Sequence, residues 1–310
     1  MMSSVVIPTY NRRATVGRAI ESALAQSVAP AEVIVVDDAS RDGTADWVAL
    51  HHPGVHLVAL TANGGAAAAR NVALRAARGD AVAFLDSDDW WEPGYLASAE
   101  RALQGAPDAV MAVSDVHMVL AYGPQPASYV QACRPNPVHP GLAQNLLLEN
   151  FITTMSCVVV RRAAIERAGL LDERLRVVHD KEWYLRLAQH GGVACTGEPL
   201  VWRTIADDNL VANLGPFLAD QFRFLDHVFD TPAGKSLRPL RWQARARVLE
   251  GFARMAHGRA QYAAAARYLL GAFAASCRDF HPDFPLLARS LAAQRGALRA
   301  RAAAAFARMK

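Results

Sequence analysis

The amino-acid sequence predicts an α/β fold in which a mostly parallel sheet is flanked by helices and followed by a C-terminal helical region. Three observations lead to this prediction. Short apolar strands alternate with amphipathic helices over roughly the first hundred residues, a succession typical of parallel sheets covered on both faces. The segment 33–36 is apolar at every position, as in strands buried on both faces. Residues 215–310 contain almost no strand-like segment and are rich in Ala, Arg and Leu.

The elements of the first half follow from the periodicity of their apolar residues. Strands are predicted over residues 4–7, 33–36, 55–60 and 81–85. Helices are predicted over residues 15–26, 44–50 and 65–78. The first of these helices has its apolar residues at a spacing that places them on one face, namely Val16, Ala19, Ile20, Ala23 and Leu24.

The pattern changes beyond residue 91. Helices are predicted over residues 93–103 and 181–189, and strands over residues 109–120 and 157–160. Five prolines between residues 122 and 140 exclude regular structure there and favour a long loop of the kind that often serves as a lid. Residues 215–310 are predicted to form three or four helices.

Composition narrows the class of protein. The chain has 310 residues, of which 52% are apolar, so it can bury a sizeable core and is neither disordered nor collagen-like. No apolar run reaches the ~18–20 residues of a membrane span, and residues 1–7 lack the charged region of a signal peptide. The four cysteines lie far apart without a C-x-x-C pair, which predicts reduced thiols and a cytoplasmic location.

The charges are distributed unevenly along the chain. Residues 1–214 hold 17 Lys and Arg against 23 Asp and Glu, whereas residues 215–310 hold 16 against 6. This asymmetry predicts two functionally distinct parts, divided at about residue 214. It argues against a nucleic-acid-binding protein that is basic over its whole surface.

Polar motifs follow the predicted strands of the first half, at the point where each strand ends. They are Pro8-Thr9-Tyr10-Asn11, Asp37 to Gly43, Asn63-Gly64-Gly65 followed by Arg70, and Asp86-Ser87-Asp88-Asp89. Open parallel sheets bind ligands in the crevice outside the carboxyl ends of their strands. We therefore expect a ligand site at this edge.

The D-x-D motif of Asp86 and Asp88 is a candidate metal site. Alternate residues of an extended chain point the same way, and two converging carboxylates repel each other unless a cation lies between them. Mg²⁺ and Mn²⁺ bind through one or two carboxylates together with phosphate oxygens. The alternative is a turn of acidic residues that caps the helix beginning at Pro93.

The other strand ends also have two interpretations. Asp37 or Asp38 can accept hydrogen bonds from a base or a ribose, or can cap the helix over residues 44–50, a role that Asp42 or Ser40 could serve instead. The backbone at Gly64 and Gly65 can approach a phosphate, or the two glycines simply begin a helix. The chain has no G-x-G-x-x-G motif after the first strand, which disfavours a Rossmann dehydrogenase. It also has no P-loop and no G-x-S-x-G motif.

Taken together, the four motifs resemble those of the family 2 glycosyltransferases, which have the GT-A fold. The resemblance covers residues 4–100 and continues more weakly to about residue 204. It implies that the nucleotide-sugar-binding residues are Pro8, Thr9, Tyr10, Asp38, Arg70, Asp86 and Ser87. By this resemblance Asp38 binds the edge of the base, Asp86 contacts the ribose or the donor sugar, and Asp88 holds Mn²⁺ or Mg²⁺ on the diphosphate.

The second half resembles the same family over residues 169–173 and 179–187. The resemblance implies that Asp180 is the general base, whereas its place at the start of a helix also suits an N-cap. Two departures stand out. The family often has Glu where this chain has His179, and many relatives have a histidine that is absent from residues 202–209.

The resemblance implies an inverting transfer of a sugar from a nucleotide-diphosphate sugar, most commonly a UDP-sugar, to a hydroxyl of a saccharide or lipid-linked acceptor. Residues 1–105 form the nucleotide-sugar half of the catalytic domain 1–214 in this scheme, and residues 106–214 the acceptor half. Two alternatives are a nucleotidyltransferase, which normally has a Gly-rich basic loop after the first strand, and a non-catalytic nucleotide-sugar-binding module.

The last segment, residues 288–310, is predicted to be a basic amphipathic helix. It has six basic and no acidic residues, and its larger apolar residues recur at roughly helical spacing. Such a helix can lie on an anionic membrane, which suits a lipid-linked acceptor. Alternatively, its apolar face packs on the catalytic domain or on a second subunit.

Overall fold

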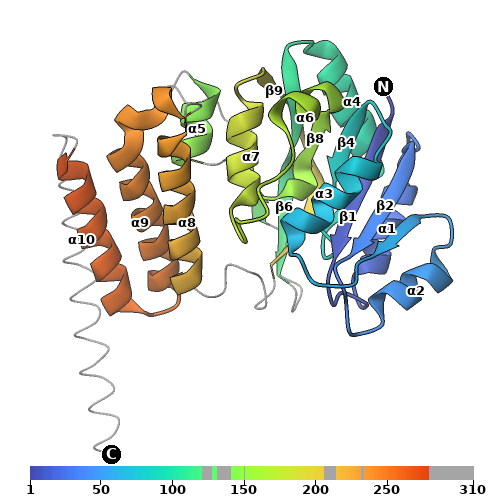
Figure 1. Cartoon of the computed structure of the whole chain (residues 1–310), viewed down its shortest axis with the longest axis horizontal. Coiled ribbons are helices and arrows are strands. Elements are labelled where there is room, and N and C mark those ends of the chain that lie inside the picture. The colour runs from blue at the N-terminus through green and yellow to red at the C-terminus, as the bar shows by residue number, and fades with distance from the viewer. Residues whose placement is uncertain (121–127, 131–140, 150, 206–213, 232–233, 279–310) are drawn as a thin grey trace, which may run out of the picture. The chain divides into compact units, whose positions relative to one another are not determined.

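The computed structural model describes residues 1–120, 128–130, 141–149, 151–205, 214–231 and 234–278 (Figure 1). The chain divides into two compact units, Met1–Asn209 and Leu210–Lys310. The first contains a mixed sheet with helices, and the second is helical in the residues described.

Four parallel strands form one half of the sheet. They are β1 (Ser3–Thr9), β2 (Glu32–Asp37), β3 (His56–Ala59) and β4 (Ala81–Phe84). The helices between them are α1 (Val16–Leu24), α2 (Thr44–His51) and α3 (Ala66–Ala76). These elements confirm the predicted strands and helices of the first half, with ends that differ by a few residues. The side chains of Val5, Val6 and Ile7 are fully buried, as expected of a central strand covered on both faces.

The second half of the sheet contains antiparallel strands. Its elements are β5 (Trp90–Trp91), α4 (Tyr95–Gly105), β6 (Ala109–Leu120), β7 (Ser128–Val130), α5 (Leu142–Glu149), β8 (Val158–Arg161), α6 (Arg162–Ala168), α7 (His179–Leu187) and β9 (Gly192–Ile205). The strand order is β3-β2-β1-β4-β8-β6-β9-β5, with β7 beside β6. Strand β8 runs antiparallel to both β4 and β6, so the sheet is parallel over its first four strands and mixed beyond them.

Strand β1 marks the topological switch point of the sheet. The chain proceeds outward from β1 through β2 to β3, and then returns to place β4 on the other side of β1. In open α/β sheets, such a reversal separates the loops that follow the two neighbouring strands and leaves a crevice between them. The predicted ligand motifs follow these strands.

The prediction of no regular structure between residues 122 and 140 is wrong for three residues. Ser128–Val130 forms β7 and pairs antiparallel with β6 through Val116, His117 and Met118. The prolines of this stretch lie on either side of the short strand rather than in it, so none removes one of its ladder hydrogen bonds. The other residues of the predicted lid lie outside the described part of the chain.

The cysteines differ from one another. Cys157 is a buried free thiol and Cys277 an exposed one, as predicted, and burial raises the pKa of Cys157 to about 12. Cys195 is disulfide-bonded, so the prediction of a reduced thiol is wrong there, because spacing along the sequence does not reveal which sulfurs the fold brings together. Cys133 lies outside the described residues.

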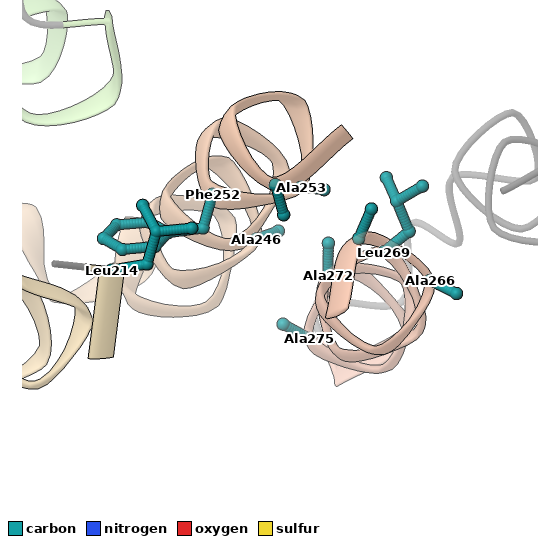
Figure 2. Packing of buried hydrophobic residues seen from close by; sticks show 10 residues of the cluster. Leu214, Ala246, Phe252, Ala253, Ala266, Leu269, Ala272 and Ala275 are labelled. Atoms are coloured by element: carbon teal, nitrogen blue, oxygen red, sulfur yellow. The ribbon is translucent and has the colours of Figure 1, made fainter. Parts of the chain in front are cut away.

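The second unit is built on three α-helices in its described part, α8 (Leu214–Asp230), α9 (Arg241–Gly258) and α10 (Tyr262–Arg278), with a 3₁₀ turn over Lys235–Leu240. This confirms the predicted helical region. Figure 2 shows its apolar core, in which Phe252 of α9 and Leu269 of α10 lie among buried alanines. Small side chains at these contacts let helix backbones approach closely. The predicted helix over residues 288–310 lies outside the described residues.

Charges within α9 are paired despite the basic composition. The buried carboxylate of Glu250 lies 3.3 Å from Arg247 and 3.1 Å from Arg254, one turn away on either side. Such pairs at helical spacing add a few tenths of a kcal/mol each. In the described part of the chain, no helix combines the length and the apolar character that crossing a membrane requires.

Candidate functional site

The motifs that follow β1, β2 and β4 lie at one edge of the sheet. Thr9 pairs with Asp37 at the ends of β1 and β2, and Val6 pairs with Phe84 at the end of β4. The amide of Asp38 donates to the carbonyl of Thr9 at 2.8 Å, which extends the β1–β2 ladder past its last pair. The strand ends therefore form one continuous floor beneath the loops.

Two of these loops are joined by a reciprocal pair of hydrogen bonds. The amide of Asn11 donates to Ser40 Oγ at 2.8 Å, and the amide of Arg41 donates to Asn11 Oδ1 at 2.8 Å. Asn11 and Ala39 both have left-handed backbones, with φ of 52° and 60°. This conformation is unfavourable for alanine, so the bonds between the loops hold them in a shape that neither would keep alone.

Two buried polar atoms at the floor lack a partner among the described residues. They are Thr9 Oγ1 and Asp37 Oδ2, on directly paired residues. The other oxygen of Asp37 accepts from the amide of Ser40 at 2.8 Å. Buried polar atoms normally have a hydrogen-bond partner, so this part of the floor suits a polar ligand. Beside it, Pro8 is buried within β1 and Tyr10 is 43% exposed.

Asp38 holds the Gly-Gly turn. Its two carboxylate oxygens accept from the amides of Gly64 and Gly65, each at 2.7 Å. Gly65 has φ of 90°, which favours glycine, and the exposed Arg176 donates to the carbonyl of Gly64 at 3.2 Å. The carboxylate of Asp38 is thus fixed in place, with both oxygens committed to backbone donors.

Helix α2 does not use the strand-end acids as caps. The residue before it is Gly43, and the amide of Thr44 donates to Asp42 Oδ1 at 3.0 Å. Asp42, rather than Asp37 or Asp38, therefore satisfies the start of this helix. Likewise α4 is preceded by Gly94 without a side-chain cap, so the acids of the D-x-D motif do not cap it.

Arg70 bridges the D-x-D motif and helix α7. Its Nη2 is hydrogen-bonded to Asp86 Oδ1, and its Nη1 lies 2.8 Å from His179 Nε2. Arg70 is 5% exposed and His179 is 4% exposed. A buried guanidinium needs such partners, because it cannot lose its charge. The bridge brings residues that are 109 positions apart into one chain of contacts, buried at Arg70 and His179 and partly exposed at Asp86.

His179 is neutral in this chain of contacts. Burial, together with the nearby charge of Arg70, lowers the pKa of its imidazole to about 4. Because arginine can only donate, Nε2 of His179 accepts the hydrogen bond and the ring proton is on Nδ1. Arg70 thus has one charged partner, Asp86, and one neutral partner.

The buried imidazole predicts a pH dependence of stability. Between about pH 6.5 and pH 4 the unfolded chain binds a proton at His179 that the folded chain does not, so stability falls as the pH falls through this window. The loss approaches about 3 kcal/mol at pH 4. Urea unfolding at several pH values should show a shallower dependence for His179→Gln than for the native chain. His56→Gln, at an exposed histidine, is the control and should follow the native curve; if His179→Gln does so too, the imidazole does not resist protonation.

The two acids at the end of the D-x-D-D motif have different environments. Asp89 is 2% exposed, and it accepts from Ser156 Oγ at 2.6 Å and from the amide of Thr204 at 2.8 Å. The side chain of Asp88 is 21% exposed, and its Oδ2 lies 3.8 Å from Arg12. Asp88 is therefore the more accessible of the two carboxylates.

The motif concentrates negative charge. Burial, together with the charges of Asp86 and Asp88, raises the pKa of Asp89 to about 8. Within the described residues, no three His, Cys, Asp or Glu side chains are grouped to hold a metal ion. An ion that takes one carboxylate and completes its shell with phosphate oxygens and water nevertheless fits Asp88. Ser87, predicted to bind the nucleotide sugar, is buried between the two acids of the motif.

Asp180 is the second residue of α7 and half-buried. The helix is preceded by Val178 without a side-chain cap, and Asp180 Oδ1 accepts from the amide of Lys181 at 2.8 Å. The alternative of an N-cap is therefore wrong. Asp180 follows His179 directly, so the bridge through Arg70 links the start of α7 to the D-x-D motif.

A tyrosine one turn along α7 is the neighbour of Asp180. Tyr184 is fully buried, and its hydroxyl has no partner within the described residues. Burial raises its pKa well above the usual value, and the charge of Asp180 adds to the effect. The hydroxyl of Tyr184, beside Asp180, therefore stays protonated.

Several residues of the site were not found from the sequence. Thr154, Ser156 and Thr204 bind the acids of the D-x-D-D motif, and Arg18 donates to the carbonyl of Asp88 at 2.9 Å. They are ordinary polar residues on strands, turns and helices distant in sequence. No spacing or motif distinguishes them from surface residues.

Comparison with known proteins agrees with this geometry. The model of glycosyl transferase family 2 matches residues 4–169. The succinoglycan biosynthesis protein ExoO of Rhizobium meliloti (strain 1021) is 37% identical over 200 residues, which are 62% of this chain and 56% of that protein. The putative teichuronic acid biosynthesis glycosyltransferase TuaG of Bacillus subtilis (strain 168) is 47% identical over 30% of this chain and 38% of its own. This chain thus spans only about half of the first relative and less of the second.

A third relative and a solved structure extend the comparison. The UDP-Glc:alpha-D-GlcNAc-diphosphoundecaprenol beta-1,3-glucosyltransferase WfaP of Escherichia coli is 40% identical over 28% of this chain and 36% of its own. The crystal structure of S. aureus TarS 1-349 in complex with UDP-GlcNAc superposes with a TM-score of 0.63 at 19% identity, and covers 88% of this chain and 82% of that one. The likeness confirms the predicted GT-A fold.

Proposed function

The chain belongs to glycosyl transferase family 2, and from this premise we propose that it is an inverting glycosyltransferase. The donor is a nucleotide-diphosphate sugar, and a UDP-sugar in particular. The acceptor is a hydroxyl of a saccharide or of a lipid-linked glycan. The name of the E. coli relative WfaP, which specifies a UDP-glucose donor and a diphosphoundecaprenol acceptor, supports both choices.

The observation that carries this proposal is the buried bridge from Asp86 through Arg70 to His179. It joins the D-x-D motif, which serves the donor, to the helix whose second residue is Asp180. A transferase that works by direct displacement needs its donor site and its base on the two sides of one reacting carbon. The bridge holds the D-x-D motif and the start of α7 in fixed positions relative to each other, because a buried arginine with two partners has little conformational freedom.

Each residue then has a role in the transfer. Pro8, Thr9, Tyr10 and Asp38 form the base pocket, to which the unpartnered hydroxyl of Thr9 contributes a polar contact. Arg70 stabilises negative charge on the phosphate side, and Asp86 and Ser87 contact the ribose or the donor sugar. Asp180 accepts the proton of the acceptor hydroxyl as that oxygen attacks from the face opposite the leaving group. A single displacement of this kind inverts the anomeric centre.

A divalent metal completes the proposed site. Asp88 would hold Mn²⁺ or Mg²⁺, which stabilises the charge that develops on the diphosphate leaving group. After burial, the charges of Asp86 and Asp88 are the next causes of the raised pKa of Asp89, and like charges so close together favour a nearby cation. The acid-rich turn therefore suits this ion.

Three parts of the chain have different proposed roles. We assign nucleotide-sugar binding to residues 1–105, acceptor binding to residues 106–214, and an accessory role to the basic helices of residues 215–310, which contact an anionic membrane or a second subunit. The cytoplasmic location stays a prediction, and the disulfide at Cys195 is a feature less common in that compartment.

A thermal-shift screen tests the proposal. UDP-sugars and UDP are expected to raise the melting temperature in the presence of Mn²⁺ more than in EDTA, because a ligand that binds only the folded state stabilises it in proportion to its occupancy. ATP and NAD⁺ serve as controls and should give little shift. A larger shift with nucleoside triphosphates than with UDP-sugars would favour a nucleotidyltransferase. Binding of UDP-sugar without any metal-dependent hydrolysis or transfer would favour a non-catalytic module.

A further inference from the structure

A column of stacked side chains runs beside the D-x-D motif from α1 to β6. The guanidinium of Arg18 lies 3.7 Å from the centre of the Trp90 ring. Trp90 stacks on Trp202 with ring centres 5.5 Å apart and an angle of 5° between the rings, and Trp202 stacks on His117 at 4.3 Å. Because Trp90 and His117 both pair with Trp202 in the sheet, neighbouring strands supply the three rings.

The column ends on the backbone of Asp88. Nη2 of Arg18 donates to the carbonyl oxygen of Asp88 at 2.9 Å, and Thr204 Oγ1 donates to the same oxygen at 2.6 Å. Thr204 belongs to β9, as Trp202 does, so the stack and the two hydrogen bonds tie α1, β5 and β9 to one peptide group. Two donors on one carbonyl fix the plane of that peptide.

Two other acids of the motif, Asp86 and Asp89, are held by a different hydroxyl. The amide of Asp86 donates to Ser156 Oγ at 3.0 Å, and the carboxylate of Asp89 accepts from the same hydroxyl at 2.6 Å. The peptide between Asp88 and Asp89 is held on both sides, because the amide of Asp89 donates to the carbonyl of Asp86 at 3.0 Å while Arg18 and Thr204 donate to the carbonyl of Asp88. The plane of this peptide sets ψ of Asp88, so the contacts of Arg18 and Thr204 help to set the direction from which the carboxylate of Asp88 projects.

We propose that Arg18, held flat on Trp90, is a positioning residue of the donor site that orients the carboxylate of Asp88 for the metal–diphosphate complex. The proposal rests on the proposed function, since it assumes that Asp88 binds the metal. Arg18 acts through the backbone of Asp88 rather than on the substrate. Residues that orient a metal ligand through hydrogen bonds affect metal affinity strongly.

The choice of arginine follows from the geometry. A planar guanidinium can stack on an indole and donate in its own plane at the same time, whereas the compact ammonium of lysine cannot do both. Trp202, which supports Trp90 from the other side, is itself held by a hydrogen bond of 2.6 Å from its indole nitrogen to Glu92. Arg18→Lys therefore keeps the charge but loses the orientation.

Titration of the full-length protein with Mn²⁺ at a fixed concentration of UDP tests the proposal, with bound Mn²⁺ followed by electron paramagnetic resonance. Arg18→Lys is expected to raise the half-saturating Mn²⁺ concentration about tenfold. Its melting temperature and its affinity for UDP in EDTA should stay unchanged. Trp90→Leu should shift the Mn²⁺ midpoint in the same direction, and Trp90→Phe, which keeps an aromatic face, should shift it less. Arg75→Lys, at an exposed arginine of α3, is the matched control and should bind as the native chain does.

Two results would overturn the inference. One is an Mn²⁺ midpoint for Arg18→Lys equal to that of the native chain. The other is an equal loss of UDP affinity with and without Mn²⁺, which would place Arg18 on the nucleotide itself. Failure of the proposed function is distinguishable from both, because the native chain would then show no metal-dependent binding of UDP at all.

Discussion

Asp180→Asn is expected to reduce sugar transfer about 10²-fold or more while leaving the affinity for the donor nearly unchanged. Asparagine keeps the size of the side chain and can still accept from the amide of Lys181, the bond that Asp180 makes at 2.8 Å. It cannot accept the proton of the attacking hydroxyl. The rate of transfer to a saccharide acceptor and the thermal shift with UDP-sugar and Mn²⁺ are the two measurements required.

A matched control is available in α2. Asp46 also lies in the first turn of a helix, where Asp180 lies in α7, and Asp46 is exposed. An acid in that position stabilises its helix by a few tenths of a kcal/mol through the helix dipole. If Asp180→Asn and Asp46→Asn both retain native transfer rates, Asp180 serves only its helix and is not the base.

Asp88→Asn is expected to reduce metal-dependent turnover by about 10²-fold or more. The amide is nearly isosteric with the carboxylate but carries no charge, so it binds a hard divalent ion poorly. The fold should persist, because the side chain of Asp88 is 21% exposed and its ion pair with Arg12 is long, at 3.8 Å. Turnover across a series of Mn²⁺ concentrations and direct Mn²⁺ binding in the presence of UDP measure the effect.

The control is Asp108→Asn, at an exposed acid on the turn between α4 and β6. It should behave as the native chain in both measurements. Native turnover by Asp88→Asn in the presence of EDTA would contradict the assignment of Asp88 as a metal ligand. Melting curves of the two variants separate a loss of metal binding from a loss of structure.

The strands and helices of the first half could be predicted because their signals are local. Strand β2 reads as four successive apolar residues, and α1 shows a stripe of buried residues at helical spacing. The antiparallel placement of β8 between β4 and β6 could not be predicted. A short apolar segment such as Val158–Arg161 has the same local pattern whichever neighbours and direction it takes.

Asp38 shows that a recognised motif does not reveal the contacts of its residues. The sequence identifies it as a strand-end acid, and the resemblance gives it a role on the base. The structure adds that both of its oxygens accept from the amides of Gly64 and Gly65. Those bonds explain how the Gly-Gly turn is held, which neither residue type nor spacing indicates.

The family, the order of the strand-end motifs and the positions of the acids could be identified from the amino-acid sequence, because these depend on residue type and short spacing along the chain. How the acids are held depends on contacts between distant segments, which the three-dimensional structure reveals. Arg70 meets His179 across 109 positions, and Arg18 meets Thr204 across 186. Contacts at such separations arise when the fold packs helices and turns from distant segments against one sheet, and burial there, rather than any local pattern, makes His179 neutral and Asp89 a weak acid.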